Sequence, residues 1–331
     1  MKLVSILIPA YKPSHFRMCL ASAVAQTWEN REIIVSDDCP TDAIRDIVAE
    51  FGAQVTYLRN PNPGGWGVNN VNHVMAAAKG DYIKFLFDDD ILHPFCTQYL
   101  VEALEATADR NVKLAFSPRR TIDEHNHPIE LINPFGVTST TVVEGREIIR
   151  RMAKTLLNPI GELTTVLFRK QDLVEPDGSI EFMKIRGKPC NGLGDVSVFT
   201  HLLAKGNAVA APDTLSYFRI HTGSLSSHGK NGNWPHLIMD WRKVIDLAAD
   251  EGIVEGSELY SAYVYLTENI RAWLHAYPDF AETFAGELED IAVSARRLPL
   301  GDQEQKALAA LARSFIPHKK GLLAKLRAVA F

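Results

Sequence analysis

The sequence contains few cysteines, and none of them has the spacing of a metal-binding motif. Only four occur in 331 residues, at the widely separated positions Cys19, Cys39, Cys96 and Cys190. The absence of any C-x-x-C pair excludes the common zinc modules and thiol–disulfide redox motifs. Scattered single cysteines are typical of proteins that keep their thiols reduced, so we expect a cytoplasmic protein.

Long apolar runs are also missing. No window approaches 18 uninterrupted apolar residues, so we expect no helix that spans a membrane. The apolar run at residues 3–10 is short and is followed by Tyr11, Lys12 and Pro13, without the small residues of a signal-peptide cleavage site. We therefore interpret it as the first strand of a sheet.

The chain has no excess of positive charge. Its 35 Lys and Arg residues are outnumbered by 40 Asp and Glu residues, which gives a net charge of −5 and a pI near 6.1. A nucleic-acid binder normally has a basic surface, so we expect no nucleic-acid partner. The hydrophobic fraction of 46% is ordinary for a globular protein, and 331 residues favour two lobes over one.

Three consecutive carboxylates, Asp88, Asp89 and Asp90, follow the short apolar run 82–87. Ligands of open α/β sheets bind at the carboxyl ends of the strands, where this triplet would lie. Neighbouring carboxylates repel one another, and a hard cation such as Mg²⁺ would relieve the repulsion. A solvated acidic loop is the alternative.

The first 116 residues alternate between apolar strands and amphipathic helices. Expected strands are 3–8, 32–36, 55–58, 82–87 and 112–116, and the second of them ends in Asp37 and Asp38. Such alternation predicts an α/β fold with a mostly parallel sheet and helices on both faces. Beyond residue 118 the pattern is weaker, and from about residue 234 it is entirely helical.

Five ordered segments resemble the motifs of family 2 glycosyltransferases with the GT-A fold, a Rossmann-like α/β architecture. The resemblance extends over roughly residues 3–222. Its motifs are VSILIPAYKP (4–13), SAVAQTWENREIIVSDDCPTD (22–42), GVNNVNHVMAAAKGDYIKFLFDDD (67–90), GLGDVSVFTHLLAKG (192–206) and YFRIHTGSLS (217–226).

The resemblance implies an inverting transferase that uses a nucleotide-diphosphate sugar, with a UDP-sugar favoured. Pro9 and Tyr11 would flank the nucleobase, Asp38 would bind its N–H with Asp37 alongside, and Asp88 would contact the ribose. The acceptor would be a hydroxyl of a glycan or a lipid-linked saccharide, as in the synthesis of a bacterial surface polysaccharide.

The same resemblance implies a divalent metal, Mn²⁺ or Mg²⁺, on the donor diphosphate. Asp89 and Asp90 would hold it, and His221 would close over the metal or the diphosphate. The register within the triplet is open, because the first Asp of the family's D-x-D-D falls on Phe87 in one alignment, and Asp88-x-Asp90 is the alternative. Asp195 would be the general base.

Two further residues have roles implied by their positions in these motifs. Asn72 stands where the family has a pocket asparagine, and Arg219 is placed to neutralise the diphosphate. Each residue also has a simpler interpretation. Asp38 suits an Asx turn, Asp195 suits a helix N-cap, and the other three, Asn72, Arg219 and His221, suit an exposed surface.

We expect two regions, a catalytic domain at residues 1–225 and a helical region at 226–331 that serves acceptor recognition, oligomerisation or contact with a membrane. Its last segment, 317–331, places Lys319, Lys320, Lys325 and Arg327 among leucines. This pattern fits either a basic amphipathic helix on the inner face of an anionic membrane or a helix docked on the protein.

Two other functions compete with this interpretation. A nucleotidyltransferase also places acids at strand ends, but it needs a Gly-rich basic signature near the first strand, which PAYKPSHF (9–16) does not supply. A degenerate transferase that only binds a partner is the third alternative. The presence of Asp38, Asp88, Asp89, Asp90 and Asp195 argues against it.

Overall fold

The computed structural model describes residues 1–180, 182–223 and 234–316. The chain divides into two compact units. One comprises Met1–Ile148, Asn158–Pro189 and Gly194–Asn231, and the other comprises Ile149–Leu157, Cys190–Leu193 and Gly232–Phe331. The domain boundary expected at 225–226 stays a prediction, and the basic segment 317–331 lies outside the described residues.

The larger unit contains an eight-stranded sheet in the order β3-β2-β1-β4-β10-β6-β13-β9. Its strands are β1 (Val4–Ala10), β2 (Arg31–Asp37), β3 (Thr56–Arg59), β4 (Tyr82–Phe85), β6 (Val112–Phe116), β9 (Thr141–Val143), β10 (Val166–Arg169) and β13 (Asn207–Ala210). Only β10 and β9 run against the others, so the predicted mostly parallel α/β sheet is confirmed.

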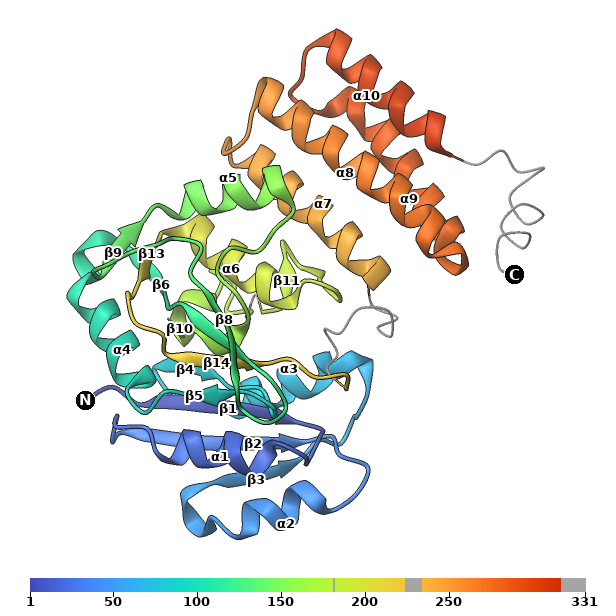
Figure 1. The fold of residues 1–331 in the computed structure, drawn as a ribbon. Coiled ribbons are helices and arrows are strands. Elements are labelled where there is room, and N and C mark those ends of the chain that lie inside the picture. Colours follow the sequence, from blue (N-terminus) through green and yellow to red (C-terminus); the bar gives the residue numbers. More distant parts are fainter. Residues whose placement is uncertain (181, 224–233, 317–331) are drawn as a thin grey trace. The chain divides into compact units, whose positions relative to one another are not determined.

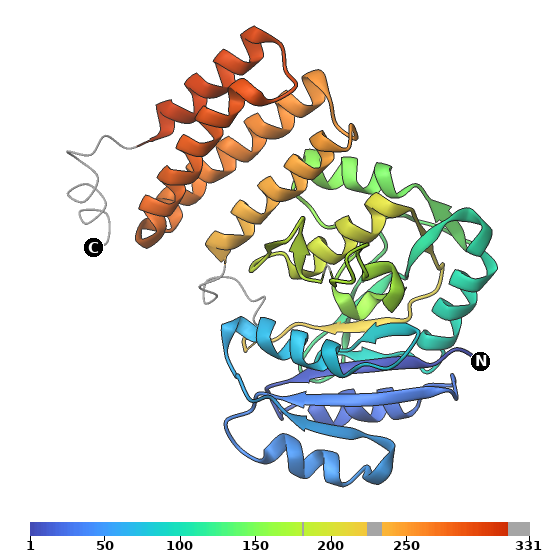
Figure 2. The same cartoon turned by 180° about the vertical axis from the view of Figure 1, so that it is seen from behind.

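Helices cover both faces of this sheet, as the sequence predicted. On one face, Val4, Ile6 and Ile8 of β1 belong to a core shared with α1 (Phe16–Val24), α2 (Ala43–Ala49) and α4 (Cys96–Ala106). The opposite side of β1 and β2 packs against α3 (Val68–Ala77). Figures 1 and 2 show the blue strands β1–β3 side by side from the two opposite directions. The alternation of side chains along each strand makes both faces apolar.

The first strand is longer than expected, because it continues through Pro9 to Ala10. Pro9 pairs with Ser36 of β2, whereas β4 accompanies β1 only as far as Leu7. Pro9 therefore lies where β1 has a neighbour on one side alone. Edge positions of this kind tolerate the missing N–H of proline.

A second, four-stranded sheet in the order β5-β14-β7-β8 was not predicted. It consists of β5 (Ile91–Leu92), β7 (Arg119–Ile122), β8 (Pro128–Ile132) and β14 (Ser216–Arg219). β14 runs parallel to β7 and antiparallel to β5, which directly follows the acidic triplet. This small sheet therefore brings the end of β14 next to the end of β4, although they are far apart in sequence.

The described residues of the larger unit also contain α6 (Gly194–Lys205) and the short hairpin β11 (Lys184–Ile185) and β12 (Lys188–Pro189). Short 3₁₀ turns join several elements: η1 (Gly52–Gln54), η2 (Gly65–Gly67), η3 (Ala108–Arg110), η4 (Leu163–Thr165) and η5 (Lys170–Leu173). A further helix, α5 (Gly145–Thr155), begins in the larger unit and ends in the smaller one.

The described residues of the smaller unit from 234 to 316 are helical, as expected. Its main elements are α7 (Trp234–Asp250), α8 (Gly256–Ala276), α9 (Ala281–Ser294) and α10 (Asp302–Phe315), with the turns η6 (Pro278–Phe280) and η7 (Ala295–Arg297). Along α8, Leu259, Tyr263, Leu266 and Ile270 are buried with helical periodicity, and the helix packs against its neighbours through them. No helix among the described residues is long and apolar enough to cross a bilayer.

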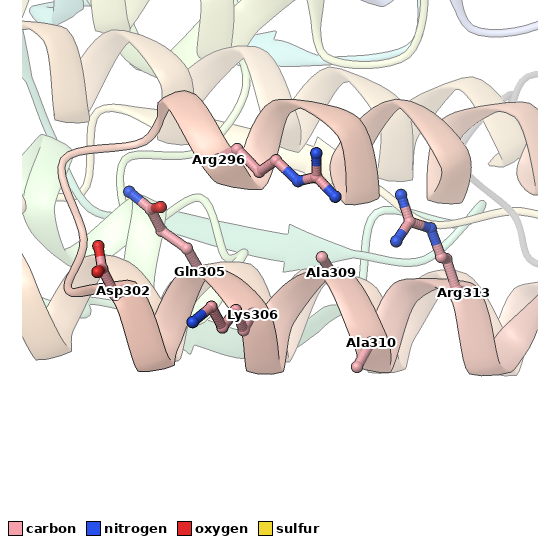
Figure 3. A pocket seen from close by; sticks show the side chains of 7 residues that line it. All are labelled: Arg296, Asp302, Gln305, Lys306, Ala309, Ala310 and Arg313. Atoms are coloured by element: carbon pink, nitrogen blue, oxygen red, sulfur yellow. The ribbon is translucent and has the colours of Figure 1, made fainter.

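An open groove of about 420 Å³ lies between the start of η7 and α10 in this unit. Figure 3 shows the guanidinium groups of Arg296 and Arg313 extending into it from the two sides. Arg296, Lys306 and Arg313 are all exposed, and Asp302 adds a negative charge at one end. The groove is a surface feature of the helical unit with charged side chains at its rim.

Candidate functional site

The parallel strands β1, β2 and β4 bring their terminal residues to one edge of the sheet. Ala10 at the end of β1 pairs with Asp37 at the end of β2, and Leu7 pairs with Phe85 of β4. The residues that follow are Tyr11, Asp38 and the acidic triplet. The structure thus gathers the acids that the sequence placed after separate strands.

Asp88 holds the loop that follows β1. Its Oδ2 accepts hydrogen bonds from the backbone N–H groups of Tyr11 at 2.6 Å and Lys12 at 2.7 Å. Burial, together with the negative charge of Asp89, nevertheless raises the pKa of Asp88 to about 6. The ammonium group of Lys12 donates to the carbonyl of Gly223, two residues after His221. The β1–α1 loop is therefore fastened to both the triplet and the end of β14.

Asp89 points to His221, with 3.0 Å between its Oδ2 and the imidazole Nε2. Both side chains keep some exposure, 16% for Asp89 and 10% for His221. His15, which precedes α1, places its ring edge-on to His221 at a centroid distance of 5.4 Å. Burial lowers the pKa of His15, and the neighbouring Arg219 and His221 add to the effect. Sequence reasoning missed His15; its only signal was its position between the first strand and the first helix.

Asp90 faces the protein interior and is completely buried. Its Oδ2 accepts a bond from the hydroxyl of Thr164 at 2.8 Å, and its Oδ1 accepts one from the backbone N–H of Arg219 at 3.1 Å. Burial raises the pKa of Asp90 well above its usual value, and repulsion from Asp89 adds to the shift. The three adjacent carboxylates therefore serve three different sets of partners.

The guanidinium group of Arg219 is fully engaged with protein oxygens. It donates from Nε to the Asp89 carbonyl at 2.8 Å and from its two terminal nitrogens to the Asp123 carbonyl and Asn126 Oδ1, both at 2.7 Å. The side chain is 1% exposed. Arg219, predicted as a counter-charge for a diphosphate, is placed here between the triplet and the turn that joins β7 to β8.

The two acids at the end of β2, Asp37 and Asp38, have different hydrogen-bond partners. Asp37 is completely buried and accepts bonds from the Cys39 N–H, the Tyr57 hydroxyl and Arg59, which is the pattern of an Asx turn with a structural role. Asp38 accepts one bond through Oδ1, from the Asn60 side chain at 2.6 Å. Its Oδ2 has no hydrogen-bond donor among the described residues, so this oxygen remains free for a ligand.

Two asparagines on α3 have opposite environments. Asn70 is 2% exposed and donates to the carbonyls of Ala10 and Ser36, which joins the ends of β1 and β2. Asn72, the residue predicted for the donor pocket, is exposed on the same helix. Helix phase therefore places Asn70 at the strand edge instead of Asn72.

The two residues predicted to flank the nucleobase differ in exposure. Pro9 is buried within β1, whereas Tyr11 is 55% exposed beyond its end.

Asp195 lies in the first turn of α6, which begins at Gly194. Its Oδ1 accepts a bond from the next backbone N–H, that of Val196, at 2.8 Å, and its Oδ2 accepts one from the amide of Asn158 at 3.0 Å. This is not the N-cap geometry, in which the residue before the helix binds the second or third N–H. Burial raises the pKa of Asp195 to about 6, with repulsion from Glu162 as a smaller cause.

Glu162 is a second acid near Asp195 that sequence reasoning missed. It is paired with Arg119, with 2.9 Å between Oε2 and Nε, and burial raises its pKa although Arg119 lowers it. Its negative charge also acts on Asp90. Asp195 and the triplet thus lie within the electrostatic range of one carboxylate. No sequence signal pointed to Glu162, because it belongs to none of the quoted motifs.

The acids and histidines of the site offer few ligands for a divalent cation. No cluster of three or more histidine, cysteine or acidic residues with the arrangement of a metal site occurs within 1–180, 182–223 and 234–316. Asp89 and His221 form a pair of side chains that can both bind one cation. One or two protein ligands are enough for Mg²⁺, which fills its remaining positions with water and substrate phosphates. The pair therefore fits a cation that binds together with a diphosphate.

An open, mostly parallel sheet of this topology, with acids at the carboxyl ends of β2 and β4, defines the GT-A class of fold. Solved structures of this class resemble the chain along its whole length. Residues 1–349 of S. aureus TarS in complex with UDP-GlcNAc superimpose with a TM-score of 0.60 at 16% sequence identity, covering 95% of this chain and 88% of that one. The UDP complex of the same protein gives a TM-score of 0.59.

The sequence profile of Glycosyl transferase family 2 matches residues 5–173, about half of the chain, and the chain belongs to this family. An uncharacterized glycosyltransferase of Rickettsia typhi is 31% identical over 133 residues, which are 40% of this chain and 41% of that protein. One of Haemophilus influenzae is 26% identical over 178 residues, 53% of this chain and 56% of that protein. The chain thus spans about half or less of the length of these relatives.

Proposed function

We propose that this protein transfers a sugar from a nucleotide-diphosphate donor to a hydroxyl group of a glycan or glycolipid acceptor, with inversion at the anomeric carbon. The Asp89–His221 pair at the carboxyl end of β4 carries the proposal, because it is the acidic and partly accessible part of the edge where this class of sheet binds ligands. A UDP-sugar is favoured, since S. aureus TarS, which shares the fold, is described with UDP and with UDP-GlcNAc.

The nucleotide would lie across the ends of β1 and β2. Asp38 offers its free Oδ2 to a base N–H, and Asn60 orients the carboxylate from the other side at 2.6 Å. Tyr11 is exposed next to this position, so its ring is available to stack on a base. Asp88 holds the backbone of Tyr11 and Lys12, and we assign it the ribose as well as this loop.

Asp89 and His221 would hold a divalent cation, Mn²⁺ or Mg²⁺, on the donor diphosphate. When bound, such a cation acts as a Lewis acid for the departing diphosphate. Asp90 and Arg219 fit a different role than the ligand roles expected from the resemblance. Their bonds are directed to the protein, and Arg219 contacts both Asp89 and Asp90 two residues before His221. Asp90 and Arg219 would hold the side chains of Asp89 and His221 at the separation that binding one cation requires.

Asp195 is the proposed general base for the acceptor hydroxyl. Its two oxygens receive only neutral N–H donors, whereas Glu162 is paired with a guanidinium group that weakens it as a base. A pKa of about 6 leaves Asp195 ionised at neutral pH and makes it a stronger base than an ordinary aspartate. The hydroxyl oxygen would attack the anomeric carbon while the bond to the diphosphate breaks, and its proton would pass to Asp195.

Calorimetric titration of UDP, with Mn²⁺ and with EDTA, tests the donor site. We expect EDTA to weaken binding by at least tenfold and the variants Asp89→Asn and His221→Ala to lose the dependence on the metal. Asp109→Asn is the matched control, because Asp109 is exposed in η3 and takes no part in the site. Equal UDP affinity with and without the cation would refute the metal role. Release of UDP from UDP-GlcNAc and other UDP-sugars with oligosaccharide acceptors tests the transfer itself.

A further inference from the structure

The loop between Asn158 and Thr165 contacts both the proposed general base, Asp195, and the acidic triplet. Near its start, the Asn158 amide donates to Asp195 Oδ2 at 3.0 Å. Near its end, the Thr164 hydroxyl donates to Asp90 Oδ2 at 2.8 Å, in the triplet that contains Asp89. A short stretch of chain thus connects the proposed base with Asp90, the buried neighbour of the proposed metal ligand Asp89.

The amide of Asn158 has no freedom to reorient. Its Oδ1 accepts bonds from the backbone N–H groups of Ile160 at 3.0 Å and Gly161 at 3.2 Å, and its Nδ2 donates to the Gly161 carbonyl at 2.7 Å as well as to Asp195. Three bonds to the loop therefore fix the direction of the fourth. The assignment of oxygen and nitrogen follows from these partners, since the opposite orientation would bring Nδ2 against two N–H donors.

The loop is held by hydrogen bonds within it and by a bond from β4. Thr165 donates to the Glu162 carbonyl at 2.8 Å, and the buried ammonium group of Lys84 on β4 donates to the Thr164 carbonyl. Gly161 has a φ of +115°, and a Cβ there would lie 2.6 Å from the Arg119 guanidinium group. The loop is thus held rigidly against the central strand, which is what the orientation of a neighbouring side chain requires.

We propose that Asn158 is a positioning residue for the general base. It directs the Asp195 carboxylate toward the acceptor hydroxyl and favours its ionised form by donating a hydrogen bond to it. This role rests on the proposed function of Asp195. A misplacement of about 1 Å can cost about 100-fold in rate, so the contact matters because it fixes the position of Asp195.

The test compares Asn158→Ala with Thr165→Val over a range of pH. Thr165 is buried in the same loop, but its hydroxyl bonds only to the carbonyls of Ile160 and Glu162, so Thr165→Val disturbs the loop without removing a contact to the base. For Asn158→Ala we expect kcat to fall by about 10- to 100-fold with an unchanged KM for the donor. The acidic limb of its pH–kcat profile should move upward by up to about one unit, because the lost donor favoured the ionised carboxylate.

A purely structural role predicts a different outcome. Both variants would then lose activity in proportion to their thermal stability, and the acidic limb would stay at its wild-type pH; this result would overturn the proposal. The variant Asp195→Asn shows whether only the role of Asn158 is refuted or the role of Asp195 as general base as well. If Asp195→Asn retains turnover, Asp195 is not the base and both ideas fall. If it is inactive while the limb of Asn158→Ala does not move, only the role of Asn158 is refuted.

Discussion

Replacing Asp195 by asparagine should separate catalysis from stability. Asparagine has nearly the same shape and its Oδ1 still accepts a bond from the Val196 N–H, so the start of α6 should remain folded. The variant can no longer take a proton. General-base catalysis contributes about 10²- to 10⁴-fold, so turnover should fall by that factor while the Kd for UDP stays the same.

The same substitution should change how stability depends on pH. The pKa of Asp195 is about 6 in the folded protein, against about 3.9 for an aspartate in an unfolded chain. The folded state therefore binds the proton more tightly, and the wild type loses stability as pH rises from about 4 to 6. A difference of about two pKa units corresponds to about 3 kcal/mol. This figure is an upper limit, because the side chain of Asp195 keeps some exposure and solvent weakens the effect.

Urea unfolding of wild type and Asp195→Asn at pH 4.5, 6 and 8 measures this effect. The free energy of unfolding of the variant, relative to wild type, should rise by about 1–3 kcal/mol between the lowest and the highest pH. Asp88 and Asp90, whose pKa values are also raised, occur in both proteins and cancel, whereas Glu162 enters the difference through its repulsion with Asp195. A constant difference across pH would show that burial does not raise this pKa. Near-wild-type turnover would remove Asp195 from the reaction.

Two further substitutions test the donor side and the buried support of the site. Asp38→Ala should weaken UDP binding by about 10- to 150-fold in a calorimetric titration, because a hydrogen bond to a charged group is worth about 1.5–3 kcal/mol; an unchanged Kd would make Asp38 structural. Arg219→Lys should lower the free energy of unfolding by about 2–5 kcal/mol, since an ammonium group cannot reach the carbonyls of Asp89 and Asp123 and the amide of Asn126 together. A loss below 0.5 kcal/mol in urea unfolding would contradict the role of Arg219.

The positions of the acids at the carboxyl edge of the sheet could largely be predicted from local sequence. The acids after β2 and β4 could be placed because the carboxyl ends of parallel strands meet at one edge, and the period of the apolar residues identified those strands. The α/β fold and the helical C-terminal region are confirmed for the same reason. These features depend on short windows of sequence, in which hydrophobic periodicity dominates.

The directions of individual side chains could not be predicted. Asp88, Asp89 and Asp90 are adjacent, yet their partners are Lys12, His221 and Thr164, which lie in three distant parts of the chain. The choice of Asn70 over Asn72 depends on the phase of α3 against β1, which an amide-rich helix does not reveal. The pairing of β5, β7, β8 and β14 into one sheet was missed because these strands are short and β8 is mostly exposed, without an apolar alternation.

The arrangement of β10 has a consequence for folding during synthesis. β10 fills the gap between β4 and β6, both of which precede it in the chain, and β6 gains its second neighbour only from β13. A nascent chain that ends before Val166 therefore exposes the unpaired backbone of two apolar strands, and exposed edges of this kind invite pairing with other chains. Emergence of β10 from the ribosome is thus the event that joins the strands β3-β2-β1-β4 to β6, and a stalled or truncated chain that stops short of it should aggregate.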